Sequence, residues 1–199
     1  MGQRLVITVK GFGKDLAKIY YHWSAYSISA LREAKELLDC LCEDYKVTEK
    51  ELQLRLVRFC EQNGGGIQGK DSEIDYIKKM FPGETFKTEG YSRNYGLIAL
   101  SEEGMADLQE WSEGDICIDF DDDLIHNNVF YYYSCIDEYN QDRKEWDDEH
   151  EDLSLEDVPD IGCNLECFTF CEIDAMIAAL RTADDYVVRH GKEIFELIA

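Results

Sequence analysis

The sequence lacks long apolar runs, contains very little proline and, over its second half, has few basic side chains. No stretch approaches the roughly 18 consecutive apolar residues that a membrane-spanning helix needs. Residues 1–10 lack the basic, apolar and small-residue order of a secretion signal. Only 2 prolines occur among 199 residues, so no proline-rich linker divides the chain. These absences predict a globular protein of the cytoplasm.

Compact signatures of nucleophilic catalysis are missing as well. His22 and Ser24 lie two residues apart, but no Gly-x-Ser-x-Gly elbow surrounds them. Such an elbow holds the nucleophile exposed and close to its base, which two neighbours on one strand do not achieve. We therefore expect no catalytic residue and no enzymatic activity.

One metal-binding pattern, that of a calcium loop, is incomplete. Asp119, Asp121 and Asp123 begin like a calcium loop, but Leu124 replaces the glycine and Phe130 the bidentate glutamate that such a loop requires. The dense carboxylates leave a loose Ca²⁺ or Mg²⁺ site as an alternative. We expect no metal and no cofactor.

Cysteine is plentiful, at 8 residues. A chain of ordinary size without an export signal keeps such thiols reduced, mostly as core residues. Cys163, Cys167 and Cys171 recur every four residues and would share one face of a helix beginning before them, where zinc is the alternative interpretation.

Charge is distributed very unevenly. The 20 Lys and Arg against 43 Asp and Glu give a net charge of −23, with a pI near 4.4. Residues 1–100 carry 15 basic and 14 acidic side chains, whereas residues 101–199 carry 5 and 29, a net charge of −24. Such a surface repels phosphate backbones and anionic lipids, so we expect no direct binding of DNA and no membrane binding. Confinement to one half predicts a preferred, basic partner.

Alternation of apolar and polar residues predicts two antiparallel hairpins. Residues 4–10 alternate, the glycines at 11 and 13 supply a turn, and alternation resumes to Trp23. Residues 115–121 alternate similarly, and we place a polar turn at 122–128 and the return strand at 129–135. A further strand is expected at 95–100. The tip of the second hairpin is strongly negative.

Helical periodicity and capping residues predict the remaining elements. We expect helices from Ser27 or Ser29 to about Asp44, from Thr48 to Asn63, over residues 72–81, over residues 102–112 and after Thr169. Thr48 with Glu51, and Thr169 with Glu172, have the spacing of capping boxes, and Ser101 suits an N-cap. Residues 137–160 contain twelve acids and read as an acidic arm pinned by Trp146 and a few leucines.

The expected fold is α+β, with antiparallel hairpins forming a small sheet packed against several helices and with an acidic C-terminal half. We divide the chain into a near-neutral half, 1–100, and a strongly acidic half, 101–199. The two halves are expected to form one compact unit. The glycine-rich residues 63–70 are a candidate hinge.

The acidic hairpin and arm are the predicted partner-binding site. Duplex DNA presents one negative charge per roughly 1.7 Å of axis, so a protein with carboxylates at similar density can occupy a basic nucleic-acid groove. Aromatic side chains among the acids would anchor the contact. The predicted partner-binding residues are Asp119, Asp121, Asp122, Asp123, Trp146, Asp147, Asp148, Glu149, Glu151 and Asp152.

Two strings resemble known proteins. The opening Met1-Gly2-Gln3-Arg4-Leu5 and the string Tyr20-Tyr21-His22-Trp23-Ser24-Ala25-Tyr26 resemble the starts of small proteins of phages and mobile elements of Gram-positive bacteria. The likeness covers about the first 45 residues and transfers no functional residue. In overall type the chain is similar to anti-CRISPR and other anti-defence inhibitors, several of which imitate nucleic acid.

The resemblance and the charge together favour an inhibitor acting in the bacterial host cytoplasm. Its partner would be a host protein with a basic nucleic-acid-binding groove, most specifically a CRISPR nuclease complex. Two alternatives stay open: a divalent-metal-dependent hydrolase that uses acidic residues, and a self-associating phage structural or regulatory protein.

Overall fold

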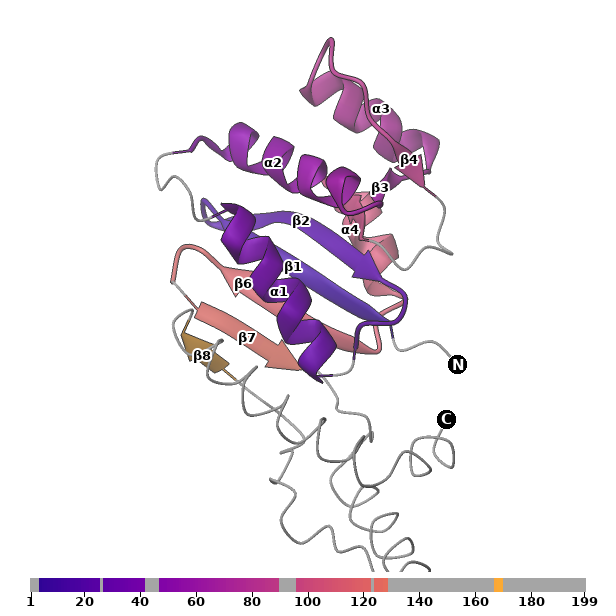
Figure 1. The fold of residues 1–199 in the computed structure, drawn as a ribbon. Helices are drawn as coiled ribbons and strands as arrows, with labels where there is room; N and C mark the ends of the chain where they lie inside the picture. Colours follow the sequence, from indigo (N-terminus) through magenta and orange to yellow (C-terminus); the bar gives the residue numbers. More distant parts are fainter. Residues whose placement is uncertain are drawn as a thin grey trace, which may run out of the picture.

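The computed structural model describes residues 4–25, 27–41, 47–89, 96–122, 124–128 and 167–169. These residues form four helices around one eight-stranded sheet (Figure 1). The strands are β1 (Leu5–Gly11), β2 (Lys14–Tyr21), β3 (Gly66–Gln68), β4 (Thr88–Glu89), β5 (Leu97–Ala99), β6 (Gly114–Asp119), β7 (Leu124–Asn128) and β8 (Cys167–Thr169). The helices are α1 (Ser27–Leu41), α2 (Glu49–Gln62), α3 (Asp71–Met80) and α4 (Glu102–Gln109).

The sheet is mixed, with the strand order β4-β3-β5-β2-β1-β6-β7-β8. β1 pairs antiparallel with β2 on one side and parallel with β6 on the other. β3 runs parallel to both β4 and β5. These helix-linked parallel pairs make the fold α/β, which corrects the predicted α+β class, while the predicted hairpins and packed helices are present. Strands from both sides of residue 100 share this sheet.

Both predicted hairpins form, but the second is placed differently from the prediction. β1 and β2 pair from Leu5 with Tyr21 to Gly11 with Lys14. The return strand of the second hairpin is β7, inside the segment predicted as a turn, and its Ile125 pairs with Ile118 and is fully buried. The strand predicted at 129–135 lies outside the described residues.

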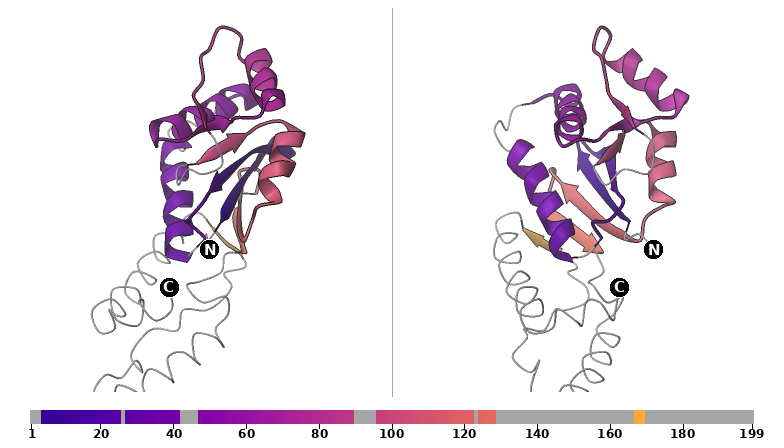
Figure 2. Two further views of the ribbon diagram at one scale, coloured as in Figure 1. Left: turned by 90° about the vertical axis from the view of Figure 1, so that its right-hand side faces the viewer. Right: turned by 45° about the vertical axis from the view of Figure 1, so that its right-hand side comes forward.

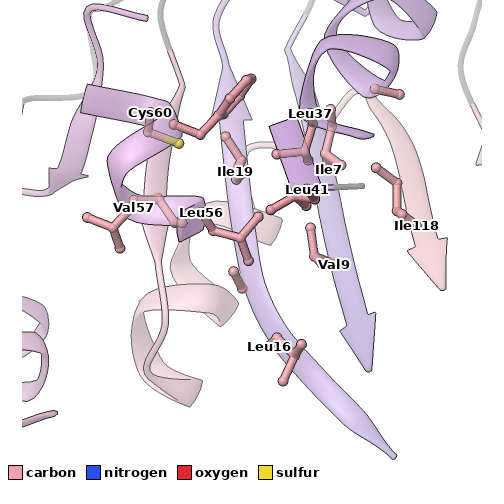
Figure 3. Packing of buried hydrophobic residues seen from close by; sticks show 14 of the residues in the cluster. Ile7, Val9, Leu16, Ile19, Leu37, Leu41, Leu56, Val57, Cys60 and Ile118 are labelled. Carbon is pink, nitrogen blue, oxygen red and sulfur yellow. The ribbon is translucent and has the colours of Figure 1, made fainter. Parts of the chain in front are cut away.

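Side-chain alternation along the strands gives the sheet two apolar faces. α1 and α2 cover one face and α4 lies on the other (Figure 2). In the larger cluster, Leu37 and Leu41 of α1 and Leu56 of α2 gather over β1 and β2 (Figure 3). The smaller cluster consists of Val6, Tyr20, Leu97, Ala99, Met105 and Leu108. Each large side chain buried this way contributes roughly 1.5–3 kcal/mol.

The predicted helix starts at Thr48 and Ser101 are confirmed. The Thr48 hydroxyl accepts a hydrogen bond from the Glu51 backbone N–H, and the Glu51 carboxylate accepts one from the Thr48 N–H at 2.8 Å. Ser101 Oγ accepts from the Gly104 N–H at 3.0 Å. Each bond satisfies a backbone donor that the first helical turn leaves unpaired.

A buried carboxylate ties α3 to the start of α4. Glu73 is fully buried, and its Oε1 accepts the Leu100 backbone N–H at 2.7 Å. The Ser101 N–H and hydroxyl also donate to Glu73. Gly104 makes this possible, because an ideal Cβ there would overlap Glu73 Oε2. Both oxygens of the Glu73 side chain are thus hydrogen-bonded, as buried polar groups must be.

The glycine-rich segment proposed as a hinge contains a strand. β3 lies between β4 and β5, and Gly66 is buried so close to the Lys87 carbonyl that a Cβ there would collide with it. The glycines therefore serve close backbone approach at this point rather than a flexible connection. Cys167 lies in strand β8, so a helix beginning before it, which would place the three cysteines on one face, does not form there; Cys163 and Cys171 lie outside the described residues.

Candidate functional site

The turns of the two hairpins lie together at one end of the sheet, on the left in Figure 1. The β1–β2 turn consists of Phe12 and Gly13, and the β6–β7 turn begins at Phe120. The two segments meet because β1 and β6 are neighbouring parallel strands, and the Phe120 N–H donates to the Lys10 carbonyl at 3.1 Å. We call Phe12, Gly13, Asp119, Asp121 and Asp122 the tip surface.

Asp121 joins the two turns directly. Its Oδ1 accepts the Phe12 backbone N–H at 3.0 Å, and its Oδ2 accepts the Gly13 N–H at 2.8 Å. Asp119 orders its own turn by accepting the backbone N–H groups of Asp121 at 3.0 Å and Asp122 at 3.3 Å. An aspartate that bonds the backbone two residues ahead is a common device of tight turns. The carboxylates are therefore fixed in place.

Phe12 has an unusual backbone conformation for its residue type. Its φ is 56°, followed by a φ of 75° at Gly13, the sign pattern that tight hairpin turns require at both central positions. Asn and Gly adopt such angles easily, whereas another L-residue is destabilised by roughly 1–2 kcal/mol. The side chain is also 52% exposed. The turn thus places an apolar ring in water on a strained backbone.

The charge of the tip surface is negative. The two lysines nearest the β1–β2 turn already face carboxylates: Lys14 lies 2.7 Å from Glu49, and Lys10 lies 3.9 Å from Asp15. The carboxylates of Asp119 and Asp121 accept hydrogen bonds from neutral backbone N–H groups. Asp121 and Asp122 are exposed. The end of the sheet therefore carries an excess of carboxylates, of which those of Asp119 and Asp121 are held in place.

Many other acids of residues 101–122 serve the fold itself. Asp107 pairs with Lys70, and Asp115 accepts bonds from Gln109 and Ser112. The Arg4 guanidinium bonds Glu113 at 2.5 Å and lowers the pKa of that carboxyl. Among the described residues 101–122, some exposed acids take part in none of these fold-stabilising contacts and can meet a partner. They are Glu102, Glu103, Glu110 and Asp122. Only part of the acidic surplus is therefore available for recognition.

The predicted partner-binding residues are only partly described. Asp119, Asp121 and Asp122 lie together at the tip surface. Asp123, Trp146, Asp147, Asp148, Glu149, Glu151 and Asp152 lie outside the described residues. Phe12 was missed by sequence reasoning, although an aromatic residue between two turn glycines was a signal.

Two further polar contacts lie near the end of β2. Ser24 Oγ donates to Glu33 Oε1 at 3.1 Å, while His22 Nδ1 shares a 2.8 Å hydrogen bond with the Tyr20 hydroxyl. The serine and the histidine are therefore directed to different partners. Burial raises the pKa of Glu33 to about 7, an effect that the Ser24 bond opposes.

Burial also raises the pKa of the Tyr21 hydroxyl and of the Cys60 thiol, and the nearby Glu33 charge adds to both effects. Both groups therefore remain protonated at neutral pH. Because the thiolate is the nucleophilic form of cysteine, Cys60 acts here as a core residue.

Among the side chains that the structure describes, no three of the His, Cys, Asp and Glu type gather closely enough to hold a metal ion. None of the described helices combines the length and the apolar character needed to cross a membrane. No protein-family model, curated protein or solved structure matches this chain. The charge and geometry of the tip surface therefore carry the functional proposal.

Proposed function

We propose that this chain is a stoichiometric inhibitor, encoded by a phage or mobile element, that binds a host nucleic-acid-handling protein. It blocks the DNA- or RNA-binding channel of its target with an acidic surface. In its most specific form the target is a CRISPR nuclease complex. The observation that carries the proposal is the net charge of −24 confined to residues 101–199, which includes the carboxylates of the tip surface.

The spacing of the carboxylates supports imitation of a phosphate backbone. Asp119, Asp121 and Asp122 fall within four consecutive positions, and no Lys or Arg occurs between residues 101 and 142. Duplex DNA presents one phosphate charge per roughly 1.7 Å of its axis. Lysine and arginine side chains that bind these phosphates would meet a comparable density of negative charge on this surface. Opposite charges also steer the encounter and raise the association rate.

Fixed geometry adds to the effect of charge. Asp119 and Asp121 are held by backbone N–H groups, so their positions are set before a partner arrives. Binding then costs less side-chain entropy than it would for freely rotating carboxylates. Because exposed charges are screened over about 8 Å at physiological ionic strength, such binding weakens as salt is added.

The test is a DNA-cleavage assay with purified, guide-loaded CRISPR nucleases. The full chain is titrated against each nuclease, and cleavage is measured at low and at physiological salt. We expect inhibition to be complete near a one-to-one ratio and to weaken as the salt concentration rises. Unchanged cleavage by every nuclease at several-fold excess of the chain would refute the CRISPR target, and inhibition unaffected by salt would refute the electrostatic mechanism.

Charge-reversal variants locate the contact. The test variant carries Asp122→Lys with Asp147→Lys, Asp148→Lys and Glu149→Lys, and it leaves intact the two aspartates that hold the turns. The matched control reverses four exposed acids in the near-neutral half, Glu36, Asp39, Asp71 and Asp75, on α1 and α3. We expect the test variant to lose inhibition and the control to retain it. Equal loss in both would mean that net charge alone, rather than this surface, is responsible.

A further inference from the structure

Phe12 has two unfavourable features that the fold itself does not compensate. Its backbone adopts a positive φ that Asn or Gly would adopt more readily, and its ring is 52% exposed. Within the described chain, the ring stacks on no other aromatic ring and on no cation. A residue that destabilises its own turn in this way is a candidate for contact with another molecule.

The support beneath Phe12 is rigid. The Asp121 carboxylate holds the N–H groups of both turn residues, at 3.0 Å and 2.8 Å, and Lys10 bonds to the neighbouring hairpin through its carbonyl. The ring therefore projects from a turn fixed at both sides. An aromatic side chain with only two rotatable bonds on such a support loses little entropy when it is buried by a partner.

The surroundings of Phe12 define the chemistry of that partner. Asp121, which is bonded to the Phe12 backbone, and the next residue Asp122 are exposed, while Lys10 and Lys14 face carboxylates of this chain. An anionic lipid surface would be repelled, and so would a second copy of a chain with net charge −23. A protein surface with an apolar pocket bordered by Lys or Arg fits both the ring and the carboxylates.

We infer that Phe12 is the anchor of the partner-binding surface, inserting into an apolar pocket that borders basic side chains of the partner protein. This inference rests on the proposed function for the basic character of the partner and adds the apolar pocket. Asp121 and Asp122 then contact the basic border, and the pocket distinguishes the true partner from other basic proteins. Charge supplies attraction, and the ring supplies selectivity.

The variant Phe12→Asn separates binding from folding. Asparagine suits the positive φ, so we expect the full-length variant to unfold at a higher urea concentration than the parent chain. If the ring serves a partner, the same variant binds less well despite its greater stability. Phe12→Tyr keeps the ring and should bind like the parent. Trp23→Asn is the matched control, since Trp23 is 46% exposed beyond the opposite end of β2.

The binding probe is a random dodecapeptide library displayed on yeast and selected on the immobilised full chain at low salt. We expect the selected peptides to combine Lys or Arg with large apolar residues, and to bind Phe12→Asn roughly ten- to a hundredfold more weakly. Binding to Trp23→Asn should be unchanged. Selection of purely basic peptides, selection of none, or equal binding to parent and Phe12→Asn would each overturn the inference.

Failure of the Phe12 anchor can be distinguished from failure of the proposed function. Peptides that depend on Phe12, together with nucleases that are not inhibited, would retain the anchor and reject the CRISPR target. Inhibited nucleases, together with peptides that ignore Phe12, would retain the acidic inhibitor and reject the anchor.

Discussion

Glu33 gives the sharpest test of the interior of this fold. Glu33 lies on α1, its carboxyl is partly buried and hydrogen-bonded to Ser24, and its pKa is raised from 4.5 to about 7, chiefly by burial. The variant Glu33→Gln keeps an oxygen that can accept the Ser24 hydroxyl and removes the ionisable proton. We therefore expect the variant to fold in the same way and to differ from the parent only where Glu33 would be charged.

The magnitude follows from proton linkage. The native state holds the proton more tightly than the unfolded chain, so raising the pH through the interval from 4.5 to about 7 destabilises the parent. At roughly 1.36 kcal/mol per pKa unit, the destabilisation is about 1 kcal/mol near pH 5 and about 3 kcal/mol above pH 8, an upper bound because some water reaches the group. The stabilising effect of Glu33→Gln should therefore grow from about 1 kcal/mol near pH 5 to about 3 kcal/mol above pH 8 and then level off.

The measurement is urea unfolding of both chains, followed by tryptophan fluorescence from about pH 5, just above the pI near 4.4, to about pH 8.5. Subtracting the two free energies of unfolding removes the titration of the other carboxyls. Glu36→Gln on the same helix is the control, because its side chain is exposed, and its free-energy difference should stay within about 0.5 kcal/mol. A parent-minus-variant difference that is constant across the pH range would refute the burial of Glu33.

Three further substitutions test single contacts by urea unfolding. Asp121→Ala removes the acceptor for two turn N–H groups and should destabilise the chain by about 1–2 kcal/mol, whereas Asp122→Ala should change stability by less than about 0.5 kcal/mol; equal effects would contradict the bridging role of Asp121. Thr48→Ala should cost about 1 kcal/mol through loss of the capping box, and no loss would mean that Glu51 holds the cap alone. Gly104→Ala should destabilise by about 1–3 kcal/mol through overlap with Glu73, although alanine favours a helix; a stabilised variant would show that α4 shifts freely.

Local sequence patterns correctly predicted the elements that are specified by residues close together in the chain. The alternation of Leu5, Ile7 and Val9, followed by turn glycines, indicated the first hairpin, and Thr48 with Glu51 marked the start of α2. These signals lie within a few residues of the structure that they specify, so no tertiary contact is needed to interpret them.

The return strand of the second hairpin was misplaced because its polar residues resemble those of a turn. Residues 124–128 contain a histidine and two asparagines, a composition typical of turns. Asp119 closes the turn early by bonding the N–H groups of Asp121 and Asp122, so the chain reverses before the polar residues begin. Ile125, which pairs with Ile118, is fully buried in this strand.

The parallel pairs and the contact between the turns could not be predicted from one sequence. Asp121 bonds Phe12 across 109 positions, and only the β1–β6 pairing brings them together. The acidic tip was recognisable because its charges are consecutive, whereas the significance of Phe12 depends on a backbone angle and on exposure. Sequence therefore located the acids of the candidate site and missed the ring beside them.

The pairing of β1 with β6 also sets the order in which the sheet can be completed during synthesis. The β1–β2 hairpin can close within about 1–10 μs once its own residues have emerged, but the other edge of β1 has no strand to pair with until residues 114–119 follow. At roughly 5–20 residues per second, about a hundred further residues take about 5–20 s. During that interval the nascent chain presents Val6, Ile7 and Val9 on an open strand edge, the kind of template on which chains aggregate. A product truncated before residue 114 would keep that edge open permanently.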